Sequence, residues 1–227
     1  MFRLGKRIFD IVFSLSGLII LFPLFIIIAF LIKLNDGGPV IFKQRRVGRG
    51  GMPFNIYKFN SIRTKPSTKE GLFGPGDISD STPFGKFLRK TKMNELPQLM
   101  NVLKGEMSFV GPRPEIEKWV AVYPERWAKA LQVRPGITDK ASIMFLNEEF
   151  ILLDAEDPRK IYRDIILPRK LDLYEDYVNN HSMIVDLKII FNTLSLLLFN
   201  HHFSKKTRQK SAPATETGKQ EAIIQKQ

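Results

Sequence analysis

The hydrophobic and polar positions divide the chain into one long apolar stretch near its start and a series of short alternating segments after it. The stretch from residue 11 to residue 32 contains no charged side chain, and its 22 residues would reach about 33 Å as a helix, enough for a bilayer core. Lys33 follows at once and no small-residue cleavage site is present. The pattern therefore favours a membrane element over a cleaved signal peptide.

Basic residues flank this element on both sides, and they bear on its topology. Lys6 and Arg7 precede it, and after it come Lys33, Lys43, Arg45 and Arg46. Because basic flanks prefer the cytoplasm, both ends are expected on the same face. Pro23, in the middle of the run, would break the helix and let it enter and leave by that face. A straight span with a tolerated proline is the alternative.

The polar segments that follow predict a small mixed domain. Residues 40–43 and 53–59 have strand-like composition around a glycine-rich turn, which predicts a hairpin. Residues 108–110 read as a short buried strand before a turn in which two prolines stiffen the backbone around Arg113. Residues 64–83 predict a loop, either a lid or simple disorder.

A helix is predicted just before that strand. Its apolar residues recur at i, i+3, i+4 and i+7, and they are Leu96, Leu99, Met100 and Leu103. Lys104 and Gly105 end the helix, Asn94 is placed to cap it, and Glu95 falls in its first turn.

The last third of the chain predicts further helices. Ile161, Ile165 and Ile166 share one face, and Pro168 starts a second helix. Ser182 caps a third, apolar helix to about residue 199; because it carries Asp186 and Lys188, we expect it against the protein or in the membrane interface. The predicted fold class is α/β, with a re-entrant membrane anchor over residues 1–33, a cytoplasmic α/β domain with interfacial amphipathic helices over 34–200, and a disordered polar tail over 201–227.

Amino-acid composition limits the partners and catalytic groups that the chain can use. Lysine and arginine total 35 against 23 acidic residues, a net charge of +12, which indicates anionic partners such as phosphates, nucleic acid or acidic lipid. The absence of cysteine excludes thiolate chemistry, and three histidines argue against a histidine metal site. Catalysis therefore falls to carboxylates, arginines and lysines. Arg113, held between prolines, suits phosphate recognition, although a surface arginine in a proline turn would look the same.

Four segments together carry a family resemblance: KRIFD, GPVIFKQRRVGRGGMPFNIYKFNS, LRKTKMNELPQLMNVLKGEMSFVGPRPE and RPGITDKAS. In this order, over residues 6–193, the chain resembles the bacterial sugar transferase family, the monotopic phosphoglycosyl transferases. The resemblance implies transfer of a sugar-1-phosphate from a nucleotide diphosphate sugar to a polyprenyl phosphate such as undecaprenyl phosphate, and uridine is the expected nucleoside of the donor. That is the first membrane step of exopolysaccharide, capsule, lipopolysaccharide or glycoconjugate synthesis.

The resemblance also implies a setting. The chain is expected at the inner membrane with its catalytic domain on the cytoplasmic face, the lipid bilayer as a partner, and a homo-oligomer as a possibility. Nucleic acid is not expected as a partner, because nucleic-acid binding explains neither the membrane segment nor the ordered motifs.

Site residues carry over by position. Glu95 matches the glutamate that helps to hold Mg²⁺ in the family, and Arg89 and Lys58 match residues that neutralise phosphate charge. Arg113 matches the arginine of the GPRP turn. Arg45 and Arg134 are expected to bind substrate phosphate, since the segment of Arg134 lies near the donor nucleotide in the family.

One departure concerns the reaction itself. Asn94 occupies the position of the aspartate that attacks phosphorus in the family, and a carboxamide is a far poorer nucleophile than a carboxylate. Asn60 replaces a common arginine, and a serine follows Asp80 where a basic residue is usual. Three hypotheses follow: Glu95 attacks instead, the phosphosugar passes directly to the lipid phosphate, or the chain is an inactive binding or adaptor protein. Retention of Lys58, Arg89, Glu95 and Arg113 favours an active enzyme.

Overall fold

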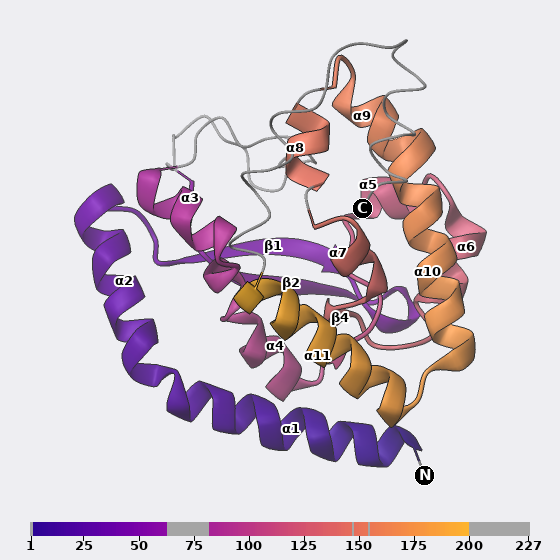
Figure 1. The fold of residues 1–227 in the computed structure, drawn as a ribbon, viewed down its shortest axis with the longest axis horizontal. Coiled ribbons are helices and arrows are strands. Elements are labelled where there is room, and N and C mark those ends of the chain that lie inside the picture. The colour runs from indigo at the N-terminus through magenta and orange to yellow at the C-terminus, as the bar shows by residue number, and fades with distance from the viewer. Residues whose placement is uncertain (1, 63–81, 147, 154, 200–227) are drawn as a thin grey trace.

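The computed structural model describes residues 2–62, 82–146, 148–153 and 155–199. Two helices, α1 (Phe2–Ile20) and α2 (Phe22–Asp36), frame one side of the molecule; α1 runs along the lower edge of Figure 1 and α2 rises from its end. Most of the loop predicted over residues 64–83, and the tail predicted over 201–227, lie outside the described residues.

The predicted break of the N-terminal apolar stretch is present. The axes of the two helices differ by 59°, and Leu21 lies between them, two residues ahead of Pro23. Pro23 falls in the first turn of α2, where its missing N–H removes no intrahelical hydrogen bond. No single helix among the described residues has the length and hydropathy of a membrane span, whereas the bent pair Leu4–Ile20 and Phe22–Asn35 meets that measure together.

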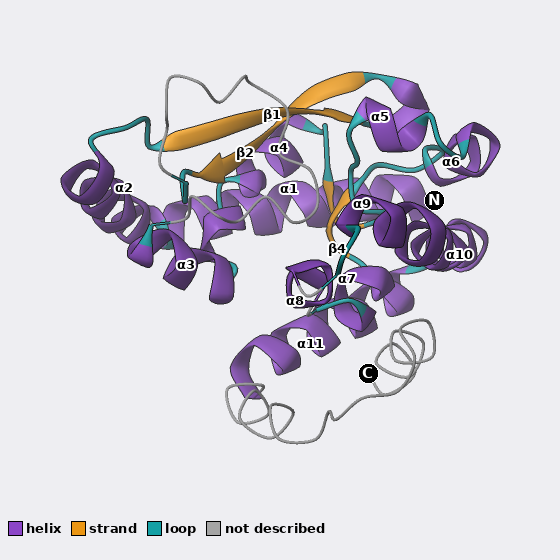
Figure 2. Cartoon of the chain, turned by 90° about the horizontal axis from the view of Figure 1, so that it is seen from above, coloured by secondary structure: helices purple, strands orange, loops and turns teal. Residues whose placement is uncertain are grey.

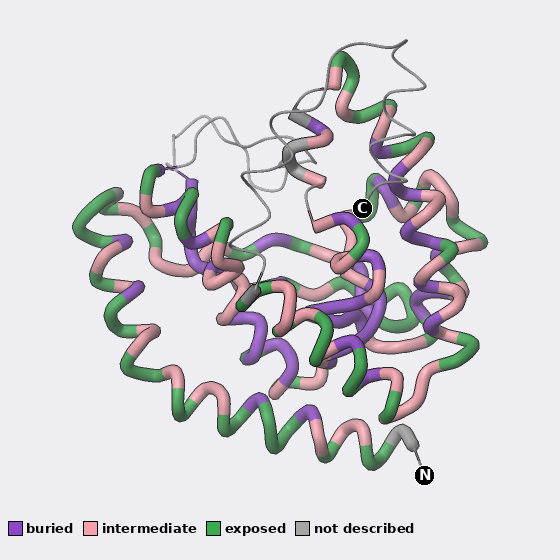
Figure 3. Tube along the Cα trace, viewed as in Figure 1, coloured by how far each residue is buried: buried purple, intermediate pink, exposed green. Residues whose placement is uncertain are grey.

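Helix α1 is polar on its buried side and apolar on its exposed side. Asp10 and Ser14 are buried, and Asp10 accepts hydrogen bonds from Ser108 Oγ (3.0 Å) and from the Phe109 backbone N–H (3.1 Å). The exposed side shows as green along α1 in Figure 3. Its large apolar residues are Leu4, Ile8, Ile11, Val12, Phe13, Leu15, Ile19 and Ile20.

Two ionic side chains tie the start of α1 to distant segments. Arg7 donates to the carbonyl oxygens of Val102 (2.7 Å) and Leu103 (2.8 Å) at the end of α4 (Gln98–Lys104). Lys6 forms an ion pair with the buried Asp186 of the last helix, α11 (Met183–Phe199). The start of α1 therefore contacts both the end of α4 and the first turn of α11.

Two small sheets form the centre. Strands β1 (Ile41–Val47) and β2 (Pro53–Phe59) are antiparallel, with Ile41 opposite Phe59 and Val47 opposite Pro53, which confirms the predicted hairpin. Its turn is the 3₁₀ helix η1 (Arg49–Gly51). Strand β3 (Ser108–Val110) is present as predicted, and it pairs in parallel with β4 (Gly136–Thr138).

Helices make up the rest. The predicted helices after residue 158 form one continuous run, in which a π-helical segment η3 (Tyr162–Ile166) joins α9 (Pro158–Ile161) to α10 (Leu167–Asn180). Helix α11 begins after Ser182, whose Oγ accepts from the Val185 N–H at 3.3 Å, as predicted. The remaining helices are α3 (Pro83–Lys90), η2 (Met93–Glu95), α5 (Glu117–Val120), α6 (Pro124–Ala130), α7 (Lys140–Met144) and α8 (Glu148–Leu153).

The core consists of several clusters. The largest lies among α5, α6, α7 and the α9–α10 run, and it includes Trp127, Tyr162 and Leu171. A second places α2 on β2 and α3 through Ile32, Phe59 and Leu88. Figure 2 shows α11 on the side of the molecule away from β1 and β2. The fold is thus a helix-rich mixture with two small sheets.

The β3–β4 pair positions the turn that follows β3, and it requires glycine. A Cβ atom on Gly111 would lie 2.3 Å from the Arg134 carbonyl oxygen, and one on Gly136 would lie 2.2 Å from the Gly111 nitrogen. The two backbones approach too closely for any side chain.

We predict that Gly111→Ala lowers the free energy of unfolding by more than about 2 kcal/mol, because the backbone must shift to admit the methyl group. The measurement is thermal unfolding of the detergent-solubilised protein. Gly5→Ala is the matched control: a Cβ there meets nothing within 4 Å, and alanine favours a helix. Equal melting of Gly111→Ala and the parent would contradict the prediction.

Candidate functional site

A cluster of three charged side chains joins three segments of the fold. The Glu95 carboxylate, in η2, accepts a hydrogen bond from Lys58 Nζ of β2 at 3.0 Å. Arg113, in the turn after β3, donates to both oxygens of Glu95, with 3.2 Å between Nη1 and Oε2. The side chains are 11% exposed for Glu95, 18% for Lys58 and 32% for Arg113. The structure thus brings together three residues that the sequence predicted as site residues.

The charges of this cluster shift one another's pKa. Burial alone would raise the pKa of Glu95, but Arg113 and Lys58 together hold it well below its usual value. Burial lowers the pKa of Lys58 to about 8 despite the attraction of Glu95, with Arg113 and Arg46 adding to the effect. Glu95 in turn raises the pKa of Arg113. Near neutral pH the cluster therefore carries one anion between two cations, a net positive charge suited to phosphate.

Hydrogen bonds fix the positions of the elements that carry the cluster relative to one another. Asn101 of α4 accepts from the Tyr57 backbone N–H at 3.0 Å and donates to the Asn55 carbonyl at 2.7 Å, which fixes α4 against β2. The position of Arg113 follows from the Gly111 contact described above. Lys58 and Glu95 are thereby brought together from positions 37 residues apart.

Arg46 and Glu115 form a second, partly buried ion pair, which was not predicted from the sequence. Arg46 donates to Glu115 Oε1 at 2.7 Å and to Gln44 Oε1 at 2.6 Å, and the Tyr162 hydroxyl donates to Glu115 Oε2. Its neighbour Arg45, predicted to bind phosphate, is exposed and pairs with Glu117 at 3.2 Å. Successive side chains of a strand point to opposite faces of the sheet, so Arg45 and Arg46 lie on opposite faces of β1. This alternation is the feature of the sequence that could have distinguished the exposed arginine from the partly buried one.

Arg89 and Arg134 lie on other elements. Arg89 Nε, on α3, donates to Ser61 Oγ at 3.0 Å, and α3 approaches Ser61 closely because Gly85 has no side chain. Arg134 Nε donates to the Gly105 carbonyl at 2.8 Å, at the opposite end of α4 from Glu95. The contribution of Arg45, Arg89 and Arg134 to substrate binding stays a prediction.

Asn94 does not cap a helix, so that expectation was wrong. Lys92 adopts a left-handed conformation (φ 57°), residues 93–95 form η2, and α4 begins only at Gln98, with Pro97 in the cap position. The proline interrupts the expected helix and moves its start by one turn. Asn94 is instead buried, and its Oδ1 has no hydrogen-bond partner among the residues that the structure describes. The cap at the other end, Gly105, is present with the left-handed φ of 86°.

The described residues contain no group of three or more acidic, histidine or cysteine side chains placed to hold a metal. Glu95 is the carboxylate available in the cluster, and its Oε2 accepts one hydrogen bond. Mg²⁺ is commonly held by one or two carboxylates together with substrate phosphates. A Mg²⁺ held by Glu95 together with substrate phosphates stays a prediction.

Comparison with known proteins establishes the class. The family model described as Bacterial sugar transferase matches residues 1–200, so the chain belongs to the bacterial sugar transferase family. This confirms the resemblance drawn from its motifs.

Individual relatives have more specific names. The chain is similar to the exopolysaccharide production protein PSS of Rhizobium leguminosarum bv. phaseoli, at 38% identity over 83% of this chain and 92% of that protein. It is also similar to the UDP-N-acetylgalactosamine-undecaprenyl-phosphate N-acetylgalactosaminephosphotransferase of Aeromonas hydrophila, at 36% identity over 85% of this chain and 43% of that protein. The UDP-glucose:undecaprenyl-phosphate glucose-1-phosphate transferase of Klebsiella pneumoniae is 35% identical over 83% of this chain and 39% of its own length.

We predict that Glu95→Gln lowers the free energy of unfolding by about 1–2 kcal/mol, because it leaves two partly buried cations without their anion. Adding Lys58→Met removes one of these cations, so the double variant should be more stable than Glu95→Gln alone. Chemical unfolding of the parent, both single variants and the double variant measures the coupling. Additive losses would show that Glu95 does not stabilise the two cations jointly.

Proposed function

We propose that the chain transfers a sugar-1-phosphate from a uridine diphosphate sugar to a polyprenyl phosphate, in the synthesis of a surface polysaccharide or glycoconjugate. The observation that carries this proposal is the Lys58–Glu95–Arg113 cluster: two cations held by one carboxylate, on a chain of the sugar transferase family. The relatives named for undecaprenyl-phosphate sugar transfer support the acceptor and the donor class.

Each member of the cluster has a distinct role in this reaction. The Arg113 guanidinium presents a planar donor fork that suits a phosphate, and Lys58 supplies a second cation. Glu95 orients both and keeps them from repelling each other in a buried place. Arg89 adds positive charge from α3. Mg²⁺, held by Glu95 and the substrate phosphates, would supply further neutralisation of the diphosphate.

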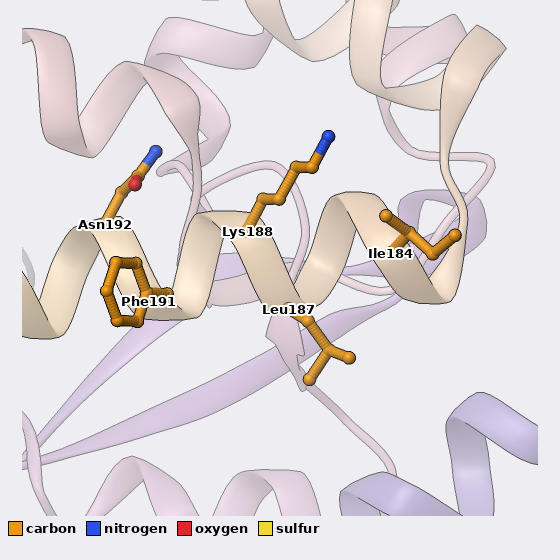
Figure 4. A pocket seen from close by; sticks show the side chains of 5 residues that line it. All are labelled: Ile184, Leu187, Lys188, Phe191 and Asn192. Atoms are coloured by element: carbon orange, nitrogen blue, oxygen red, sulfur yellow. The ribbon is translucent and has the colours of Figure 1, made fainter.

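The distribution of apolar surface supports a position at a membrane surface, which we place at the cytoplasmic face of the inner membrane as part of the proposal. A helix in water buries its apolar side, but α1 exposes its apolar side and buries Asp10 and Ser14. Helix α11 likewise exposes Ile184, Leu187 and Phe191, and Leu187 and Phe191 point away from Lys188 and Asn192 in Figure 4. We propose that these apolar faces contact lipid, which brings the cluster to the depth of the acceptor's phosphate.

An inactive adaptor is the alternative, motivated by Asn94. That alternative predicts donor binding without turnover. The charged cluster favours the enzyme, because apolar residues could replace such ion pairs without loss of stability if no anionic substrate had to be bound.

The test is release of uridine monophosphate from a panel of uridine diphosphate sugars by the purified protein, with and without undecaprenyl phosphate and Mg²⁺. We expect release from at least one sugar that requires both additions. Glu95→Gln and Arg113→Met should each lower kcat/KM by at least 100-fold, whereas exposed Lys118→Met should not. Donor binding without release from any sugar would establish the adaptor.

Activity is expected to fall at alkaline pH because Lys58 loses its charge. With its pKa at about 8, kcat/KM should fall about tenfold per pH unit above that value, and Lys58→Arg should move this limb upward. Unfolding does not account for such a fall: the unfolded chain holds the lysine proton up to its ordinary pKa of 10.5, so the contribution of Lys58 to stability rises from pH 8 to 10.5. A flat profile to pH 9.5 would exclude this role of Lys58.

The membrane position is open to a clean labelling test, since the chain has no cysteine. We predict that a polarity-sensitive fluorophore on Phe191→Cys in lipid nanodiscs emits at shorter wavelength and is quenched by brominated acyl chains. The same label on the neighbouring Asn192→Cys, which points to the other side of α11, is the matched control. Equal, water-like emission at both positions would remove α11 from the lipid.

A further inference from the structure

Arg113 lies in a turn that is held by contacts on either side of it. Neither Pro112 nor Pro114 has an N–H group to donate within the turn. The two residues before Arg113 form backbone hydrogen bonds with β4, at 3.2 and 3.0 Å. After the turn, the Val47 N–H of β1 donates to the Glu115 carbonyl oxygen at 2.9 Å. Strand β4 therefore fixes the start of the turn, and β1 fixes its end.

Side chains add to the contacts at the end of the turn. Arg46 Nη1 donates to the Pro114 carbonyl oxygen at 3.2 Å and to Glu115 Oε1 at 2.7 Å. The guanidinium is itself oriented, because its Nε and Nη2 donate to Gln44 Oε1 at 3.1 and 2.6 Å. The Tyr162 hydroxyl, in the π-helical segment η3, donates to the second oxygen of Glu115. Side chains from β1 and η3 thus bind both oxygens of the Glu115 carboxylate.

The register of the hairpin places Arg46 on the same face as Lys58. Lys58 lies opposite Phe42, and Phe42 is four positions before Arg46 on β1. Opposite residues of two strands share a face, as do alternate residues of one strand, so both cations project from one side of the hairpin. Lys58 binds Glu95, which binds the guanidinium of Arg113, and Arg46 binds the segment directly after Arg113. The hairpin therefore holds Arg113 both at its guanidinium and at its backbone.

Such a double hold matters for an arginine that binds phosphate. A guanidinium forms two parallel hydrogen bonds with a phosphate only when its plane has the right direction. A displacement of about 1 Å can lower a rate by about 100-fold. Apolar side chains can often replace a buried ion pair without loss of stability, so stability alone does not account for Arg46 and Glu115.

We propose that Arg46, Glu115 and Tyr162 are positioning residues, which direct the Arg113 guanidinium at the diphosphate of the donor; the inference rests on the proposed function. In this role the three side chains act through the backbone of the turn and not by touching the substrate. Arg46 contributes through the geometry of its planar guanidinium, which binds Gln44 on one side and the turn on the other.

A double-mutant cycle with Arg113 tests this role. Tyr162→Phe removes one oxygen atom and keeps the ring that packs on Trp119. We expect it to lower kcat/KM and the affinity for uridine diphosphate, measured by calorimetry, about tenfold each. In an Arg113→Met background the same change should alter both by less than about twofold, because the side chain that Tyr162 positions is gone. Tyr174→Phe is the matched control and should change neither value. Tyr174 is buried in the same core, and its hydroxyl makes no hydrogen bond with the part of the chain that the structure describes.

Substitutions of Arg46 separate geometry from charge. A lysine keeps the positive charge but lacks the planar arrangement of donors. We therefore expect Arg46→Lys to lose about as much affinity for uridine diphosphate as Arg46→Met does, again only while Arg113 is present. If thermal unfolding shows that Tyr162→Phe does not fold, the Arg46 variants supply the same cycle.

Each contrary outcome has a distinct meaning. Equal losses with and without Arg113 would show a merely structural role, and full affinity in Arg46→Lys would show that charge suffices. Either result would overturn the positioning role and leave the proposed function intact. A parent that binds uridine diphosphate without turnover would refute the proposed function, while the affinities would still decide the positioning role. A parent that neither binds nor turns over would refute both.

Discussion

One shared carboxylate organises the site. Glu95 is the anion for two cations that arrive from separate segments, Lys58 on β2 and Arg113 after β3. Removing three charges from water is favourable only when their geometry is well fixed. The fixed geometry comes from the surrounding fold, in which Asn101 ties α4 to β2 and Gly111 admits the Arg134 carbonyl. The site therefore depends on backbone contacts that carry no charge themselves.

The same balance between solvent and protein explains the N-terminal helices. The exposed side of α1 would be costly in water, and its buried polar side would be costly without partners. Both costs are offset if the apolar side meets lipid while Asp10 and Arg7 bind the domain. Polar side chains of α1 thus join it to β3 and to the end of α4.

Local patterns predicted much of this fold, and non-local ones account for the rest. The hairpin, the end of α4 at Gly105, strand β3 and the capped helix α11 each follow from a few neighbouring residues. Strand β4 could not be predicted because its three residues form a strand only against β3. The start of α4 was misplaced because Pro97 outweighs Asn94 as a helix boundary. Family motifs predicted Lys58, Glu95 and Arg113 as site residues. The Arg46–Glu115 pair could be predicted only by knowing which face of β1 each side chain occupies.

The ion pair between Lys6 and Asp186 has a consequence for biosynthesis. The two residues are 180 positions apart, so Lys6 leaves the ribosome long before its partner exists. During that interval the anchor carries an unpaired charge at its start, and Asp10 likewise waits for the β3 segment. Domains usually form in order from the N-terminus during synthesis. Here, however, the first helix gains its ion-pair partner only when the last helix has been made. The polar side of α1 thus gains these two partners only when translation of the later segments is complete.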